Sequence, residues 1–177
     1  MKHEDFNKDI IISIEGLGFV LYSAGNVEHI PEGTDFLKTS FWRPKDVAGH
    51  IQKGDITGFG TGSPGTFTIK LRMGKPDSDT DKNYPSAISL GLEVKGGLVS
   101  IIDLYWLMEW NNDVPSEQQF CLDDGFYRLV VLTKKPESGI WGDKQEIYIF
   151  FEKQSEMPQL TWEGVPDLLW WYEKAIS

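Results

Sequence analysis

Residues 60–65 carry the letters of a phosphate-binding glycine motif. The run G-T-G-S-P-G fits the pattern G-x-G-x-x-G. In dinucleotide-binding folds the motif follows a strand and opens a helix, so that the phosphate meets the helix N-terminus. Here an alternating strand pattern follows instead, and Pro64 lies inside the motif. We therefore expect a flexible surface loop at residues 60–65 and no nucleotide site.

Three carboxylates two residues apart resemble the start of a calcium-binding loop. Asp77, Asp79 and Asp81 could converge on a hard cation, as the first residues of an EF-hand loop do. That loop also requires Gly at its sixth position and Glu at its twelfth, where this chain has Lys82 and Ile88. A solvated loop is the expectation, with a weak calcium site as the alternative, and no cofactor is predicted.

The histidines and the single cysteine form no recognisable zinc or nucleophile pattern. His3, His29 and His50 are widely spaced, whereas a zinc site requires about four ligands. Cys121 alternates with apolar neighbours near a turn, so we expect it to be a small buried hydrophobic residue. The chain has no G-x-S-x-G nucleophile motif. We therefore expect a protein that is not an enzyme.

Asp103 is the one carboxylate for which the strand pattern raises a question. Two apolar runs, residues 87–95 and 98–110, flank two adjacent glycines, which is typical of a β-hairpin. Folding about that turn places Asp103 opposite Leu90 on the core face, where an unpartnered carboxylate costs several kcal/mol. A bulge or edge position, a structural partner and a catalytic role remain three alternatives for Asp103.

The elements that position these residues are mainly strands. Apolar and polar residues alternate with a period of two, and the chain is expected to open with a hairpin. The expected strands are residues 10–15, 19–23, 66–73, 87–95, 98–110, 118–122, 126–133 and 145–153. On the central hairpin the predicted core face consists of Ile88, Leu90, Leu92, Val94, Val99, Ile101 and Tyr105, joined by Phe67, Ile69 and Leu71 of the strand at residues 66–73.

These strands predict a mainly β protein, an antiparallel β-sandwich of Greek-key type with a short C-terminal helix. Residues 1–177 are expected to form one domain, in which residues 156–177 are a tail with a helix at 167–176. A further short helix is expected at residues 45–52, behind Pro44. The spacing Asp-x-Gly-x-Tyr, which ends at Tyr127, predicts a tyrosine corner, with an ordinary turn as the alternative.

Four aromatic residues near the C-terminus are the candidate binding residues. The four are Trp162, Trp170, Trp171 and Tyr172. A short helix that packs on the sheets through Leu168, Trp171 and Tyr172 would bury some of these rings but does not require all of them. Exposed Trp and Tyr are favoured anchors in protein interfaces and can also stack on sugars. Packing, protein contact and carbohydrate contact therefore remain open.

Charge narrows the class of partner. The formal net charge is −10 and the pI is about 4.7. Nucleic acids and anionic membranes are therefore not expected as partners, whereas a basic protein is, with simple solubility as the alternative. One cysteine, no signal-peptide pattern and no membrane-length apolar run lead us to expect a cytoplasmic protein.

The middle of the chain resembles the bacterial competence protein J family of nuclease inhibitors. The similarity runs from Thr57 to Lys153 and covers the strand at residues 66–73, the run at 87–102 and the late strand at 146–151. Its most specific part is F-x-L-x-x-G-x-Y-x-L at residues 120–129. The resemblance implies a small β protein that binds another protein as an inhibitor or immunity protein, and it implies no functional residues.

Three functions therefore remain, and a non-catalytic protein that binds a nuclease or toxin is the leading one. A carbohydrate-binding module is the first alternative, because of the tryptophans and the carboxylates at residues 77–81. A hydrolase built around Asp103 is the second, and it lacks an identified acid–base partner.

Overall fold

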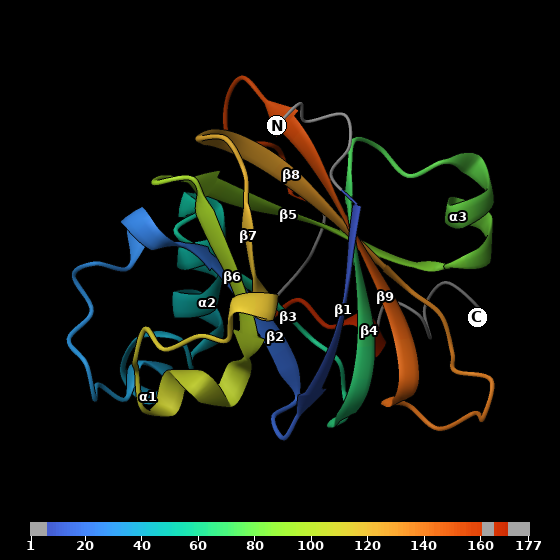
Figure 1. The fold of residues 1–177 in the computed structure, drawn as a ribbon, viewed down its shortest axis with the longest axis horizontal. Helices are drawn as coiled ribbons and strands as arrows, with labels where there is room; N and C mark the ends of the chain where they lie inside the picture. The colour runs from blue at the N-terminus through green and yellow to red at the C-terminus, as the bar shows by residue number, and fades with distance from the viewer. Residues whose placement is uncertain (1–6, 161–164, 170–177) are drawn as a thin grey trace.

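The protein is built from two β-sheets, seen in a computed structural model that describes residues 7–160 and 165–169 (Figure 1). The first sheet has five strands in the order β1-β4-β9-β8-β5. These strands are β1 (Asn7–Ile14), β4 (Gly65–Met73), β9 (Asp143–Gln154), β8 (Gly125–Thr133) and β5 (Ser86–Val94). The second sheet has the order β3-β2-β6-β7. Its strands are β3 (Ile56–Gly60), β2 (Gly18–Ser23), β6 (Leu98–Asp103) and β7 (Gln119–Cys121).

The two sheets share one hydrophobic core, which extends from Ile10 to Leu168. Aromatic rings from opposite sheets meet in it. Phe19 of β2 packs edge-to-face on Phe67 of β4, with 5.3 Å between the ring centroids, and Phe120 of β7 packs on Phe151 of β9 at 5.5 Å. The mainly β prediction is therefore confirmed, while the Greek-key sandwich and the single domain remain predictions.

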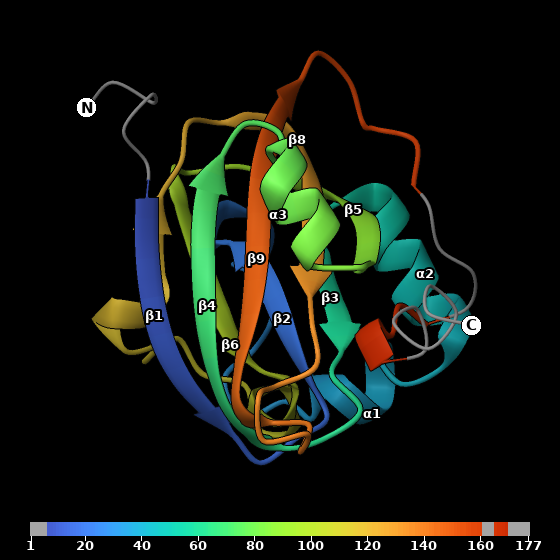
Figure 2. The same cartoon turned by 90° about the vertical axis from the view of Figure 1, so that its right-hand side faces the viewer.

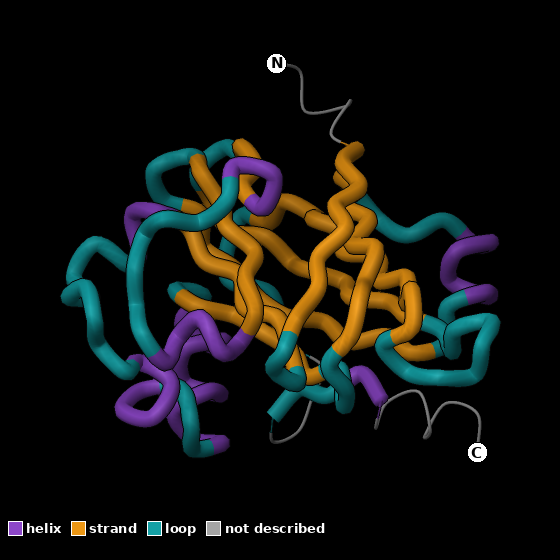
Figure 3. The backbone as a smooth tube through the Cα atoms, turned by 60° about the horizontal axis from the view of Figure 1, so that its bottom comes forward, coloured by secondary structure: helices purple, strands orange, loops and turns teal. Residues whose placement is uncertain are grey.

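Helical segments lie mostly at one side of the strands, with α3 on the opposite side (Figure 3). Within residues 7–160, the α-helices are α1 (Phe36–Ser40), α2 (Pro44–Lys53) and α3 (Ser78–Asn83), and the 3-10 helices are η2 (Ala24–Asn26), η3 (Leu104–Met108) and η4 (Ser116–Gln118). Among the described residues, no helix is both long and apolar enough to span a membrane. The helix predicted behind Pro44 is confirmed as α2.

The alternation of apolar and polar residues in β4 buries its apolar face, as predicted. Phe67, Ile69 and Leu71 are fully buried in the shared core, together with Leu90 and Leu92 of β5.

The expectation of wholly antiparallel pairing is wrong, because β4 runs parallel to β9 (Figure 2). A parallel pair requires a long crossover, and here the chain visits both sheets between β4 and β9.

The predicted hairpin at the start of the chain is not formed. β1 pairs with β4 in the first sheet, and β2 pairs with β3 and β6 in the second. The turn between them therefore crosses from one sheet to the other. The Gly16 N–H in this turn donates to the side-chain carboxylate of Asp103 in β6, and not to a backbone carbonyl of a hairpin.

The predicted central hairpin around Gly96 and Gly97 is also wrong. Both glycines have the positive φ that a tight hairpin turn requires, +86° and +70°. However, β5 pairs with β8, and β6 pairs with β2 and β7. The Gly97 N–H donates to Asp124, and the carbonyl of Lys95 accepts from Gly25. These distant partners take the place of the expected strand pairing.

The run predicted as one strand over residues 98–110 ends at Asp103 and continues as η3. Tyr105, which was expected in the core, is exposed, whereas Trp110 is fully buried against Tyr22 of β2. The predicted helix at 167–176 falls mostly outside the described residues. Leu168 is buried in the core, as predicted.

Candidate functional site

The glycine motif at residues 60–65 connects β3 to β4, so a strand follows it and not the helix that a dinucleotide-binding motif requires. The prediction of a flexible surface loop is wrong in part. Thr61 is buried, and its N–H donates to the Leu17 carbonyl at 2.8 Å. Gly65 has a φ of +147°, and a Cβ there would clash with the Gly142 carbonyl oxygen. The glycine therefore permits a close approach of two backbones.

The carboxylates at residues 77–81 serve local helix structure. Asp77 is the N-cap of α3 and accepts a hydrogen bond from the Thr80 N–H at 2.7 Å. The loop predicted at this position is thus partly helical. In the described parts of the chain, no three His, Cys, Asp or Glu side chains gather as a metal site would require.

Asp103 has a structural partner, which was one of its three alternatives. It lies opposite Phe19 of β2 and not opposite Leu90. Its carboxylate accepts from the N–H groups of Glu15 at 2.9 Å, Gly16 at 3.2 Å and Tyr105 at 3.1 Å. Asp103 therefore caps η3 and holds the turn between β1 and β2.

Two predictions near β7 have opposite outcomes. The Tyr127 hydroxyl donates to the Asp123 carbonyl at 2.7 Å, so the predicted tyrosine corner is confirmed. Cys121, predicted to be buried, is exposed. Period-two alternation in β7 turns its neighbours Phe120 and Leu122 into the core and Cys121 outward.

A His–Asp pair that sequence reasoning missed joins α2 to β3. His50 Nδ1 lies 2.9 Å from Asp55 Oδ1, and the imidazole packs between the rings of Phe36 and Phe41. Burial raises the pKa of Asp55, but the hydrogen bond and charge of His50 outweigh it, so this pKa lies below its ordinary value. In the described ranges no hydroxyl or thiol is hydrogen-bonded to His50, and the pair therefore orients α2.

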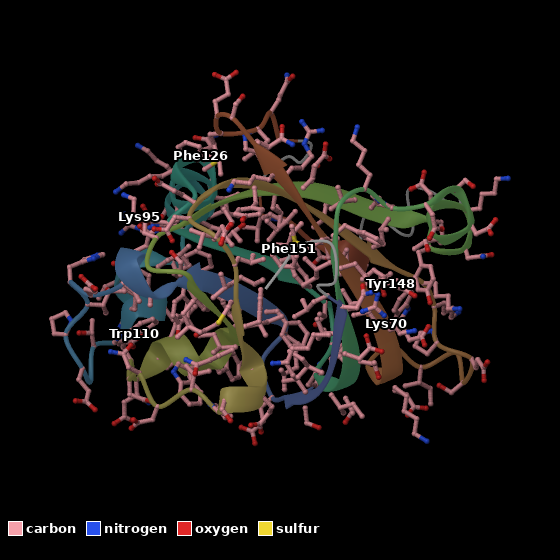
Figure 4. All side chains as sticks on the ribbon, turned by 45° about the horizontal axis from the view of Figure 1, so that its top comes forward. Lys70, Lys95, Trp110, Phe126, Tyr148 and Phe151 are labelled. Atoms are coloured by element: carbon pink, nitrogen blue, oxygen red, sulfur yellow. The ribbon has the colours of Figure 1, made fainter. Side chains whose placement is uncertain are left out.

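A polar and aromatic cluster lies on the outer face of the first sheet. Glu146 accepts from the Tyr84 hydroxyl at 2.5 Å and lies 3.1 Å from Lys70 Nζ. Figure 4 shows Lys70 beside Tyr148, and its ammonium is 5.1 Å from the centroid of that ring. The hydrogen bond from Tyr84 and then the charge of Lys70 hold the pKa of Glu146 below its ordinary value, against the effect of burial.

The predicted binding residues Trp162, Trp170, Trp171 and Tyr172 lie outside the described residues. Residues 165–169, which lie between Trp162 and Trp170 in the chain, are described and contact the second sheet. The Pro166 carbonyl accepts from the Gly60 N–H at 2.7 Å, next to a parallel bridge between Gly60 and Asp167. This segment therefore runs along the edge of β3.

An apolar groove of about 260 Å³ opens beside this segment. Three exposed side chains from distant parts of the chain lie around it: Leu17 (49% exposed), Trp42 (67%) and Val165 (46%). Its remaining lining is mostly buried and apolar, and consists of Phe19, Leu37, Phe41, Val47, Gly58, Phe59, Gly60, Leu104 and Asp167. The groove can therefore receive an apolar side chain of another molecule.

Local sequence explains why Trp42 stays at the rim. Asp35 caps α1 by accepting from the Lys38 N–H at 3.0 Å, and α1 ends at Ser40. Pro44 occupies the first turn of α2, where its missing N–H is tolerated. Trp42 lies in the short turn between these helices, in the segment whose structure the sequence left open. Its exposure to solvent has no sequence signature.

The negative charge is concentrated in two stretches of the chain. Residues 9–37 and 96–127 contain eleven of the 27 acidic residues and no lysine or arginine, so the rest of the chain is nearly neutral. β2 and β6, which belong to these stretches, pair with each other. Two hydrogen bonds between Trp110 and the Gly33–Thr34 segment join their loops, which lie on the left in Figure 1. We call this the acidic side.

No family model and no curated protein sequence matches the chain. Among solved structures it is similar to the crocagin biosynthetic gene J protein, with a TM-score of 0.51 at 10% identity over 82% of this chain and 96% of the other. It also resembles ComJ of Bacillus subtilis, an inhibitor of the DNA-degrading activity of NucA. That TM-score is 0.47 at 14% identity, over 83% of this chain and 96% of ComJ. The weak resemblance inferred from the sequence is thus confirmed, as a structural resemblance alone, and the crocagin protein shows a shared fold.

Proposed function

We propose that the chain is a non-catalytic protein that binds another protein, and that the partner docks on the groove between Leu17, Trp42 and Val165. This groove is the observation that carries the proposal. Exposed tryptophan beside a preformed apolar pocket is the usual composition of an interface hot spot. Covering three large apolar side chains removes area from water, which favours association.

The charge distribution supports a basic partner. Complementary charge speeds association and selects among partners, and residues 9–37 and 96–127 together carry the negative charge surplus of the chain. An inhibitor or immunity protein of a nuclease or toxin has such a task, because it must cover a basic, phosphate-binding active site. This role, in a bacterial cytoplasm, is part of the proposal, and it rests on the charge and not on the likeness to ComJ.

The aromatic residues predicted from the sequence extend the proposed site. Trp162 is three residues before the groove residue Val165 in the chain. Trp170, Trp171 and Tyr172 directly follow Leu169. Because of this closeness in sequence to Val165 and Asp167, we include these four residues in the proposed partner-binding surface.

Capture of partners from the native host tests the proposal. The baits are the wild-type chain, Trp42→Ala and Ile140→Ala, the last being a control because Ile140 is 65% exposed and does not line the groove. A specific partner should be retained by the wild type and by Ile140→Ala at low and moderate salt, and lost with Trp42→Ala. Recovery of no partner, or equal recovery with Trp42→Ala, would contradict the proposal.

A further inference from the structure

A second pocket, separate from the groove, opens on the acidic side between β2, β6 and the loop that follows η3. We infer that this pocket receives a lysine or arginine side chain of the basic partner, an inference that rests on the proposed function. The pocket has a volume of about 280 Å³.

The lining of the pocket suits both halves of a basic side chain. Val27, Leu98 and Val114 provide apolar surface, and Glu28, Ser100 and Asn112 provide oxygen atoms. Lysine and arginine have an apolar stem and a head that only donates hydrogen bonds. The stem would lie on the apolar residues while the head meets the carboxylate of Glu28.

A buried hydroxyl in the pocket lacks a hydrogen-bond partner. Tyr22, which is 3% exposed, lines the pocket, and within the described ranges its hydroxyl oxygen has no partner. The Ser100 hydroxyl lies near this hydroxyl and accepts a hydrogen bond from the Gln119 side-chain amide at 3.3 Å. An unsatisfied buried hydroxyl costs free energy, and a donor entering the pocket would satisfy it.

The chain's own basic residues near this region are already engaged. Lys8 Nζ donates to the Gln119 carbonyl at 2.8 Å, and Lys95 Nζ lies 3.6 Å from Glu93. The loops beside the pocket carry Glu28, Glu32 and Asp113, all exposed. A cation from another molecule would therefore meet an excess of negative charge at the pocket mouth.

Nuclear magnetic resonance titration of the full chain with acetyl-Gly-Arg-Gly-amide tests the inference, and the citrulline peptide serves as the neutral isostere. The arginine peptide should cause saturable chemical-shift changes at Ser100, Asn112 and Gln119, and the citrulline peptide should not. Glu28→Gln should weaken binding about tenfold. Glu32→Gln, in the same loop but outside the pocket, should weaken it less than about twofold.

Tyr22→Phe separates the site from diffuse charge. It should weaken arginine-peptide binding several-fold while the melting temperature stays equal or rises, because the lost hydroxyl had no partner. Equal effects of Glu28→Gln and Glu32→Gln, binding of the citrulline peptide, or no shifts at the pocket would overturn the inference. The groove variant Trp42→Ala should not change this titration, so failure here and failure of the proposed function give different results.

Discussion

The carboxylate of Asp103 accepts a hydrogen bond from the N–H of Gly16, a residue 87 positions earlier, at 3.2 Å. This contact fixes the turn that leads from the first sheet to the second. Leu17, the next residue, lies at the edge of the groove. The residue that the sequence singled out as a catalytic alternative therefore has a structural role in shaping the proposed binding site.

Asp103→Ala should lower the free energy of unfolding by about 2 kcal/mol, because three backbone N–H groups lose a charged acceptor. Asp103→Asn should cost less, since an amide oxygen still accepts. Urea unfolding measures both variants. Asp113→Ala, on an exposed loop, should change stability by less than about 0.5 kcal/mol, and an equal loss in this control would refute the role of Asp103.

Tyr127→Phe should cost about 1 kcal/mol, the typical net value of one hydrogen bond. The bond lost is the one to the Asp123 carbonyl, at the turn that opens β8. Thermal and urea unfolding would detect the change, and Tyr105→Phe serves as the exposed comparison. If the two variants were equally stable, the tyrosine corner would contribute nothing to stability.

Alkaline pH should destabilise the fold through its buried tyrosines. Burial raises the pKa of Tyr22 and of Tyr127 from 10.0 to about 12. A raised folded-state pKa gives stability that is fully present below pH 10 and is lost as the pH rises toward 12. Melting temperatures between pH 8 and pH 12 should therefore fall above pH 10, and less steeply in Tyr127→Phe. A flat profile would contradict the assignment.

Low pH should destabilise the fold by protonating Glu146. Its folded-state pKa lies below the ordinary 4.5, so its contribution is present above pH 4.5 and is lost as the pH falls through the folded-state value. Glu146→Gln should therefore make stability less dependent on pH in the acid range, as followed by urea unfolding between pH 3 and pH 7. An unchanged pH dependence in this variant would show that the cluster with Tyr84 does not contribute.

The sequence predicted most strands but not which strands pair. Period-two alternation can be read within a single strand, because it requires only that one face of the strand is buried. Phe67 and Leu92 were therefore assigned correctly to the core. Pairing depends on residues far away in the chain. Gly96 and Gly97 have hairpin-like φ values, yet Asp124 and Gly25 bind the adjacent backbone and direct the chain into the other sheet. No local pattern contains that information.

A disulfide can test the observed pairing of β6 with β7. Leu98 lies directly opposite Cys121, next to the hydrogen bond from the Leu122 N–H to the Gly97 carbonyl. Opposed residues of this kind are close enough for a disulfide. Leu98→Cys should therefore form an intrachain bond under mild oxidation, whereas Thr39→Cys in α1 should not, as mass spectrometry would report. Absence of the bond in Leu98→Cys would contradict the register.

The candidate site was only partly predictable. Composition indicated an acidic chain with surplus aromatic residues, and the predicted Trp162 is close in sequence to the groove residue Val165. Trp42 was missed, because its place at the groove arises from α1, α2 and the β1–β2 turn together. The gap in lysine and arginine over residues 96–127 was visible in the sequence and could have located the acidic side.

The central claim is that the groove binds the partner through Trp42, and the dissociation constant of the captured partner tests it most directly. Calorimetry should show that Trp42→Ala binds the partner about 2 kcal/mol less favourably, which is a dissociation constant about thirtyfold higher. The melting temperature of this variant should be unchanged. Ile140→Ala should bind as the wild type does. A Trp42→Ala variant that binds with wild-type affinity would contradict the proposed site.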